Sequence, residues 1–281
     1  MLKQRIITAL VLLAILVPVV LYPDSRLFAL VSLVMISAGG WELGRLTGLG
    51  SHAAVATGFV CFLIGALLWM AGALQMSWGV LWLLGTAFWV LFSAWVLRQG
   101  ATSWLAVPQI VRVCGGVFAL LAAWLAVSQA HAIGVNYLFS VLFLVWAADV
   151  GAYFAGRGLG GKFIRRKLAP TVSPGKTWEG AIGGMLTVFL VAALWQMVEA
   201  RGGMGAYSLY ARLSGNGPLF YAVALLFLVT MSIVGDLVES LLKRSIGVKD
   251  SSGLLPGHGG ILDRVDALLP VLPIAMMLGT L

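Results

Sequence analysis

Long stretches without Asp, Glu, Lys or Arg dominate the pattern of hydrophobic and polar positions in this chain. They are residues 6–23, 27–41, 46–97, 113–148, 180–198, 213–235 and 267–281. A helix that crosses a bilayer needs about 20 mainly apolar residues, so 46–97 and 113–148 each contain two spans. The pattern therefore predicts nine membrane-spanning helices. These are 5–22, 27–45, 53–73, 78–97, 107–128, 135–155, 179–198, 218–242 and 266–281.

The apolar runs do not alternate with polar residues, as the strands of a membrane β-barrel would. Composition agrees with buried and lipid-facing helices, since 61% of the residues are hydrophobic and only 10% are charged. The predicted fold class is an all-α integral membrane protein, a polytopic helical bundle of about nine transmembrane helices. The first span lacks a small-x-small cleavage site after it, which favours a retained helix over a signal peptide.

Lys and Arg predict the orientation of the bundle. If the N-terminus is cytoplasmic, 14 Lys and Arg lie in cytoplasmic segments, and Arg26, Arg201 and Arg212 lie outside. The loops 156–178 and 243–265 then face the cytoplasm. Arg112 is set aside as membrane-embedded. We expect residues 1–135 to form a scaffold of transmembrane helices, and residues 136–281 to carry the catalytic loops and most of the acids.

The segment 236–266 concentrates charge in a chain that otherwise avoids it. It holds nine of the 28 charged residues. They are Asp236, Glu239, Lys243, Arg244, Lys249, Asp250, Asp263, Arg264 and Asp266. Charged groups in a membrane protein are costly, and they usually serve chemistry or line a wet cavity. Acids bind metals and bases bind phosphates, so the segment indicates a phosphate-handling metal site at the edge of the bilayer.

Helical spacing predicts which acids act together. Asp236, Glu239, Ser240 and Lys243 are spaced i, i+3, i+4, i+7 and share one helix face. Magnesium prefers carboxylate oxygens together with substrate phosphates. Asp236 and Asp263 are the first candidates as metal ligands, with Glu239 and Asp266 in support.

Basic and glycine-rich positions around these acids predict phosphate contacts. Lys243, Arg244, Lys249 and Arg264 would neutralise phosphate charge, and Asp250 lies beside Lys249. The turn 256–260 places His258 among glycines, and the N–H groups of Gly259 and Gly260 could cradle a phosphate. We expect His258 to contact phosphate or leaving group rather than to act as general base.

A second polar cluster occupies residues 149–180. Asp149 and Tyr153 share a helix face, and an acid inside a span is a functional candidate by default. Lys176, preceded by Ser173, is expected to contact substrate, whereas residues 165–167 are expected to contact anionic lipid. Residues 156–161 match G-x-G-x-x-G without a surrounding βαβ unit, so a dinucleotide site is excluded. Glu42 is expected to have a structural role, paired with Arg45.

Residues 240–266 closely resemble the signature of the phosphatidate cytidylyltransferase (CDP-diacylglycerol synthase) family, S-x-hydrophobic-K-R, K-D and P-x-H-G-G-hydrophobic-x-D-R-hydrophobic-D. The segments 149–157 and 173–180 are also similar to it. The resemblance implies a membrane enzyme that converts CTP and phosphatidate to CDP-diacylglycerol and pyrophosphate. It further implies Mg²⁺, with a second cation as an option, a bacterial inner membrane, a homodimer and no nucleic acid partner.

Two other functions fit parts of the pattern. A transporter for a phosphorylated solute would also use acids within the membrane and a basic vestibule, but it would show matching halves. A CTP-dependent polyprenol kinase is the nearer rival. Pyrophosphate release from CTP in the presence of phosphatidate separates these alternatives.

Overall fold

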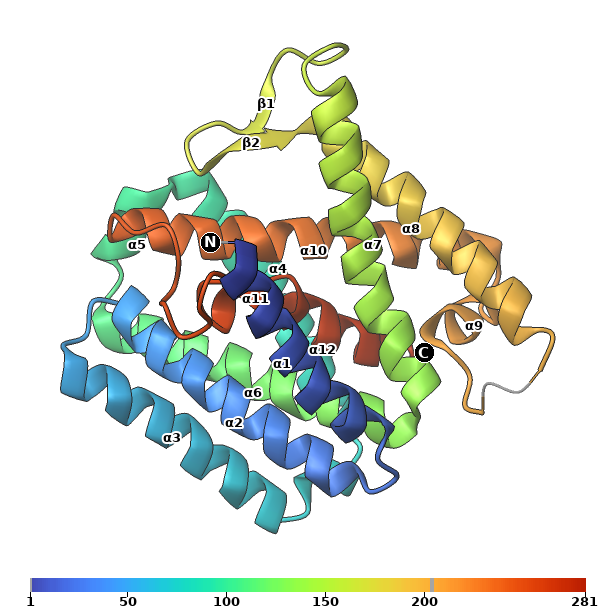
Figure 1. Cartoon of the computed structure of the whole chain (residues 1–281), viewed down its shortest axis with the longest axis horizontal. Coiled ribbons are helices and arrows are strands. Elements are labelled where there is room, and N and C mark those ends of the chain that lie inside the picture. The colour runs from blue at the N-terminus through green and yellow to red at the C-terminus, as the bar shows by residue number, and fades with distance from the viewer. Residues whose placement is uncertain (1, 203–204) are drawn as a thin grey trace.

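The computed structural model describes residues 2–202 and 205–281, and it is a bundle of long helices (Figure 1). In the described part of the chain, eight helices are long and apolar enough to cross a membrane. They are α1 (Leu2–Leu21), α2 (Ser25–Leu46), α3 (Ser51–Met70), α4 (Gly79–Gln99), α6 (Gln109–Ile133), α7 (Val135–Leu159), α8 (Trp178–Glu199) and α10 (Pro218–Ser245). The prediction of a polytopic helical membrane protein is confirmed.

Shorter elements lie between and after these helices. They are η1 (Ala73–Gln75), α5 (Ala101–Ala106), α9 (Leu209–Ser214), α11 (Leu262–Val265) and α12 (Leu268–Leu278). The loop between α7 and α8 contains an antiparallel hairpin of β1 (Lys167–Ala169) and β2 (Ser173–Thr177), which the sequence pattern did not predict. The hairpin projects beyond the helices at one end of the bundle (Figure 1).

The ninth predicted span, 266–281, is not a full-length helix. Its helix α12 has 11 residues, and most of them are buried among other helices. The segment nevertheless runs to the end of the bundle opposite the hairpin. There Arg212 Nη1 donates to the Gly279 carbonyl (3.4 Å) and Tyr137 Oη donates to the Ala275 carbonyl (3.0 Å). A buried segment needs no lipid-length helix, since neighbouring helices shield its backbone from the bilayer.

Glycines allow pairs of helices to approach closely. A Cβ added to Gly44 of α2 would lie 2.7 Å from the Ala54 Cα of α3, and one added to Gly183 of α8 would overlap Ala155 of α7. Small residues at these positions therefore let the paired helices pack closely.

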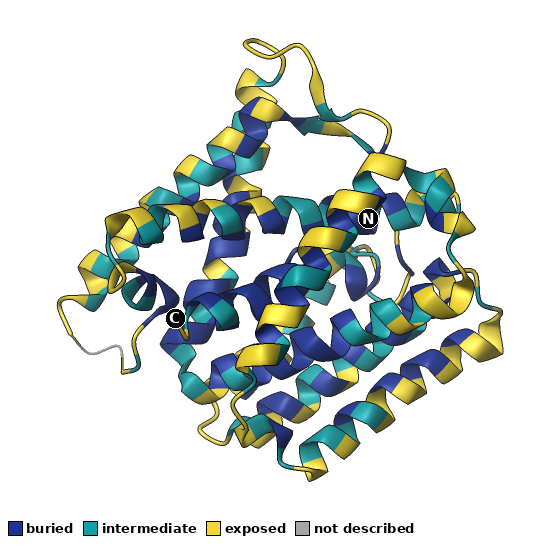
Figure 2. Ribbon diagram, turned by 180° about the vertical axis from the view of Figure 1, so that it is seen from behind, coloured by how far each residue is buried: buried dark blue, intermediate teal, exposed yellow. Residues whose placement is uncertain are grey.

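Apolar side chains cover the outer faces of the bundle as well as its interior. In Figure 2 the exposed residues lie on the outward faces of the peripheral helices, and the central helices are largely buried. Exposed side chains include Phe59 of α3 and Leu186 of α8. In water such surfaces would be costly, so their exposure fits contact with lipid tails.

Candidate active site

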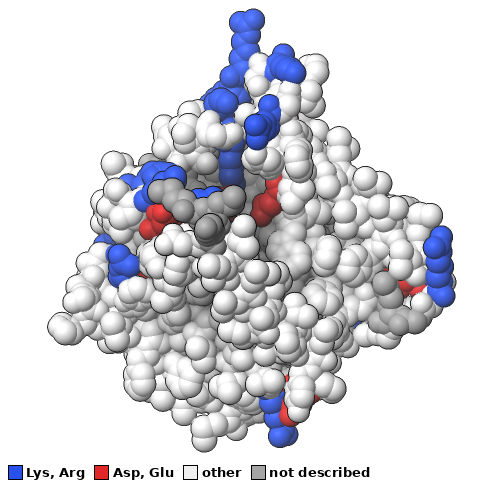
Figure 3. Space-filling view, in the orientation of Figure 1, with Lys and Arg blue, Asp and Glu red and all other residues white. Residues whose placement is uncertain are grey.

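Charged side chains gather at the end of the bundle that carries the hairpin, here called the charged end. Lys and Arg surround this end, and acidic side chains are visible in the recess below them (Figure 3). Contacts bring several segments here: Gln109 at the start of α6 donates to the Thr47 carbonyl after α2 (3.1 Å), and Thr8 of α1 donates to the Pro256 carbonyl (2.9 Å). Segments distant in sequence therefore meet around the charged groups.

Lys176 and Asp236 form an ion pair between the hairpin and α10. Their side-chain atoms are 2.7 Å apart, and the side chains are 23% and 34% exposed. Strand β2 carries Lys176 across to α10, where Ser240 also donates to Asp236 (3.2 Å). Partial exposure leaves this pair accessible to a charged ligand, as expected for substrate-binding groups.

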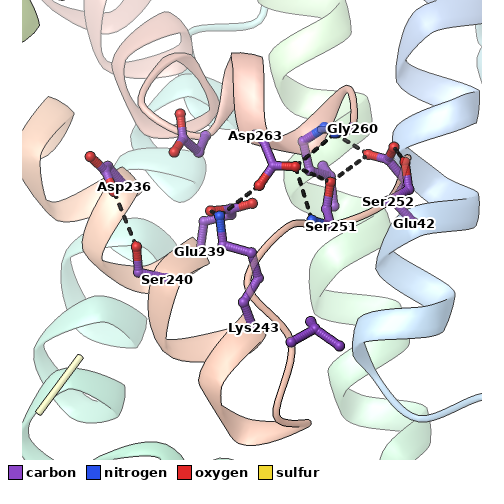
Figure 4. Close-up of polar contacts among 12 residues, drawn as sticks. Glu42, Asp236, Glu239, Ser240, Lys243, Ser251, Ser252, Gly260 and Asp263 are labelled. Carbon is purple, nitrogen blue, oxygen red and sulfur yellow. Dashed lines mark hydrogen bonds and ion pairs between the residues drawn. The ribbon is translucent and has the colours of Figure 1, made fainter. Parts of the chain in front are cut away.

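Asp263 accepts hydrogen bonds on both carboxylate oxygens (Figure 4). Lys243 Nζ donates to Oδ1 (2.6 Å), while the Ser251 N–H (2.9 Å), the Ser251 hydroxyl (2.8 Å) and the Gly260 N–H (2.7 Å) donate to Oδ2. Lys243 also pairs with Glu239 one helical turn away. Burial by itself raises the pKa of Asp263, but the hydrogen bonds from Lys243 and Gly260 outweigh it and hold the pKa below its ordinary value.

These contacts revise two expectations. The Gly260 N–H faces Asp263 rather than an open phosphate site, because the carboxylate occupies the position where a phosphate would accept. Lys243 is likewise neutralised by Glu239 and Asp263 of the chain itself. Both groups therefore hold the loop through Asp263, and neither is free to bind a substrate phosphate in this structure.

Glu42 has the structural role that the sequence pattern predicted, but its partners differ from the predicted one. It is fully buried, and it accepts from the Ser251 and Ser252 hydroxyls and from the N–H groups of Ile261 (3.0 Å) and Leu262 (2.7 Å). The predicted pair with Arg45 is wrong, because the Arg45 guanidinium lies over the Trp41 ring, 5.2 Å from its centroid. Glu42 thus fastens the loop after α10 to the N-terminal helices. Its only sequence signal was a lone acid inside an apolar span.

The turn 255–260 has a geometry that only glycine permits at two positions. Gly257 and Gly259 adopt φ of 78° and 81°, in the left-handed region. A Cβ on Gly259 would also lie 2.6 Å from Asp263 Oδ2. The His258 N–H donates to the Leu255 carbonyl (2.8 Å), and its ring Nδ1 is buried without a hydrogen-bond partner among the described residues.

Three acids come close enough for their charges to act on one another. Asp236 and Asp149 both act on Asp266, and Lys176 acts on Asp149. Asp149 lies on α7, Asp236 on α10 and Asp266 between α11 and α12. Repulsion among the three carboxylates is relieved when a proton or a cation lies between them.

The remaining predicted residues lie on the surface of the charged end. Lys249, Asp250, Arg264 and Arg244 are exposed, and Arg244 donates to the Val248 carbonyl (3.1 Å). Tyr153 is exposed and accepts from Arg157 (2.8 Å), so it does not join the acids on α10. Ser173 is half-buried at the start of β2, opposite Ala169.

The chain matches the cytidylyltransferase family over residues 3–281. The phosphatidate cytidylyltransferase of Pseudomonas aeruginosa is 39% identical over 280 residues, which cover 98% of this chain and 95% of that protein. The chain belongs to the cytidylyltransferase family. Phosphatidate cytidylyltransferases of Haemophilus influenzae (46% over 140 residues, 50% of this chain and 44% of that protein) and Bacillus subtilis (43% over 143 residues, 50% and 46%) are also similar.

Family membership raises the question of whether these residues suit a magnesium ion. The predicted ligands Asp236 and Asp263 lie in separate ion pairs, and across residues 2–202 and 205–281 no three His, Cys, Asp or Glu side chains converge as metal ligands. Magnesium usually takes only one or two carboxylates and completes its coordination with substrate phosphates and water. Partly exposed Asp236, with Asp149 and Asp266 nearby, fits that role. Asp263 stays a predicted ligand, and its carboxylate already accepts from Lys243, Ser251 and Gly260.

Glu179 is a residue for which the sequence pattern predicted no separate role. Its Oε1 accepts from the N–H groups of Gly161 (3.1 Å), Phe163 (3.1 Å) and Ile164 (2.8 Å). The carboxylate thereby ties the start of the α7–α8 loop to α8. The hairpin that carries Lys176 is positioned from both of its ends, by Glu179 and by the Lys176–Asp236 pair.

Proposed function

We propose that the charged end of the bundle is the active site of a phosphatidate cytidylyltransferase. The chain catalyses the reaction of CTP with phosphatidate to give CDP-diacylglycerol and pyrophosphate. The observation that carries the assignment of the site is the convergence of Lys176, Asp236 and the Asp263–Lys243 pair, from three separate segments, at the end of a lipid-facing bundle.

The reaction joins two polyanions, so positioning and charge neutralisation dominate catalysis. An oxygen of the lipid phosphate attacks the α-phosphorus of CTP. The bond from this phosphorus to the bridging oxygen breaks, and pyrophosphate leaves with the electron pair. A phosphate monoester is already largely ionised at neutral pH, with a second pKa of about 6, so no strong general base is required.

The chain's own residues divide these tasks. Lys176 binds a phosphate oxygen in exchange for its contact with Asp236. Exposed Lys249 and Arg264 neutralise the nucleotide phosphates and the leaving pyrophosphate, and exposed Asp250 lies beside Lys249. The Glu42 and Asp263 networks keep these groups in register. His258 lies in the same turn and contacts the leaving group.

Mg²⁺ is proposed to bind at Asp236, with Asp149 and Asp266 as neighbouring carboxylates, and a second cation is proposed as an option. When bound, such an ion neutralises phosphate charge and favours departure of pyrophosphate. Asp263 and Glu239, which were expected to be ligands, are assigned to positioning instead.

Chelation should remove this activity. We expect the purified protein in mixed micelles to release pyrophosphate from CTP only when phosphatidate and magnesium are both supplied. Excess EDTA should lower the rate at least a hundredfold, and added magnesium should restore it, since carboxylates and phosphates would otherwise repel. Release of pyrophosphate without phosphatidate would contradict the assignment. Transfer of phosphate to polyprenol with release of CDP would favour the kinase.

The active site is proposed to face the cytoplasm of a bacterial cell, with the protein in the inner membrane as a homodimer. The positive-inside rule supports this orientation, because the charged end carries the loops 156–178 and 243–265. CTP is also a cytoplasmic metabolite. The helix contacts agree with a cytoplasmic charged end, because the start of α1 and the end of α2 both lie near the loop after α10.

Cysteine labelling tests the orientation. In a variant without Cys61 and Cys114, cysteines at position 173 and at position 249 should react with membrane-impermeant reagent only from the cytoplasmic side. A cysteine at position 207, where Tyr207 is exposed in the α8–α9 connection, should react only from outside. Reaction of positions 207 and 249 from the same side would contradict the proposed crossing of α10.

A further inference from the structure

An apolar cavity of about 380 Å³ lies beside the active site, within the size range of about 300–1,000 Å³ that is typical of ligand pockets. Its walls come from α2, α4, α5, α6, α10, α11 and α12. Along α6 the lining runs from Val111 to Leu120, roughly 13 Å at 1.5 Å per residue. The cavity therefore extends from the charged end into the depth where lipid tails lie.

Arg112 lines this cavity close to the charged end of the bundle. Its side chain is 9% exposed, and neither its Nε nor its Nη1 has a hydrogen-bond partner in the described part of the chain. The guanidinium lies 5.8 Å from the centroid of the Trp104 ring, a contact that holds the group without using its donors. A buried, unpaired charge is strongly unfavourable, so its retention indicates a ligand.

The other unpartnered groups indicate what kind of ligand fits. Trp89 and Trp104 line the same cavity, and their indole N–H groups are buried and also lack acceptors among the described residues. Arg112 and the two tryptophans together offer only donors. Glu239, the acid in the lining, is paired with Lys243 and connects the cavity wall to the Asp263 network.

We propose that this cavity binds the lipid substrate, with an acyl chain along the apolar wall and phosphate oxygens on Arg112. The inference rests on the phosphatidate cytidylyltransferase function proposed above. Phosphatidate supplies phosphate and ester carbonyl oxygens as acceptors, which match Arg112 and the two indole N–H groups. Arginine binds phosphate through two parallel hydrogen bonds. CTP does not fit this cavity, because its polar base and ribose would lie against an almost entirely apolar wall.

Steady-state kinetics of the full-length protein in mixed micelles test the proposal, with CTP and phosphatidate varied separately. Arg112→Gln should raise the KM for phosphatidate about ten- to a hundredfold, as loss of a charged hydrogen bond predicts. The KM for CTP should change less than twofold, and Arg112→Lys should recover part of the loss. Arg98→Gln is the matched control, since exposed Arg98 at the end of α4 should leave both constants unchanged.

Cavity filling is an independent test. A Cβ on Gly115 would lie 3.7 Å from the Phe88 ring, in ordinary contact, so a larger side chain at this position extends into the cavity. Gly115→Leu should raise the KM for phosphatidate with long acyl chains more than the KM for dihexanoyl phosphatidate. Gly115→Leu also tests whether the cavity binds phosphatidate if the Arg112→Gln protein does not fold in sufficient yield.

Three results separate the explanations. A lower thermal midpoint for Arg112→Gln with both KM values unchanged would overturn the proposal in favour of a structural role. Loss of a copurified phospholipid, measured by native mass spectrometry, with an unchanged KM for phosphatidate would overturn it in favour of a resident lipid. If the wild type itself releases no pyrophosphate, the proposed function fails, whereas an active wild type with an unaffected Arg112→Gln variant refutes only this inference.

Discussion

Asp236→Asn is expected to lower turnover at least a thousandfold while leaving the protein folded. The substitution removes the charge that pairs with Lys176 and that we propose to bind magnesium, so transition-state charge stabilisation is lost. Both side chains of the pair are partly exposed, and such pairs contribute only about 1 kcal/mol or less to stability. The thermal midpoint should therefore shift by no more than a few degrees. Pyrophosphate release and thermal unfolding in detergent provide the two measurements.

Asp24→Asn is the matched control for this variant. Asp24 caps the start of α2 at the opposite end of the bundle, where it accepts from the Arg26 N–H (2.9 Å). The same loss of a carboxylate there should leave turnover unchanged. Near-normal turnover of Asp236→Asn at ordinary magnesium would show that Asp236 is not the magnesium ligand.

Glu42→Gln is expected to destabilise the protein by about 3 kcal/mol and to abolish most turnover. The buried carboxylate accepts from two hydroxyls and two backbone N–H groups, and charged hydrogen bonds contribute about 1.5–3 kcal/mol each. A glutamine presents its own N–H₂ to those donors and leaves at least one unsatisfied. The loop 251–262 should then detach, and Asp263 should lose its position. Thermal unfolding and proteolysis within 246–261 measure the change.

Arg45→Gln tests whether that effect belongs to Glu42 alone. If the two residues formed an ion pair, both variants would be destabilised to a similar extent. In the structure Arg45 stacks on Trp41 instead, so Arg45→Gln should keep both its stability and the protease resistance of the loop. Equal protease sensitivity of the two variants would refute the Glu42 network.

Expectations based on local spacing proved reliable where a single helix determines the outcome. The four polar residues predicted to share a face of α10 do contact one another in pairs. Asp236 contacts Ser240 and Glu239 contacts Lys243, as i, i+4 geometry predicts. The division of the chain into a scaffold, 1–135, and a catalytic part, 136–281, stays a prediction. Glu42 connects the two parts.

Expectations about pairing between segments were less reliable. That Asp263 and Asp236 bind one metal stays a prediction, and in the structure each pairs with a different lysine, because the hairpin brings Lys176 to α10 while the loop brings Asp263 to Lys243. Sequence spacing carries no information on such long-range pairings. Partner choice depends on how helices pack and on which donors reach each carboxylate.

By itself the sequence determined the helical membrane fold, most span positions and the family, since these depend on local hydrophobicity and a dense run of polar positions. Only the tertiary structure decided that 266–281 contains just a short buried helix, Leu268–Leu278, and that Glu42 holds the loop after α10. It also decided that Arg112 lies beside an apolar cavity without a hydrogen-bond partner for its Nε and Nη1 among the described residues. Each of these depends on contacts between residues far apart in the chain. Burial and hydrogen-bond satisfaction are properties of the packed molecule, and they select one arrangement among the many that the same local pattern permits.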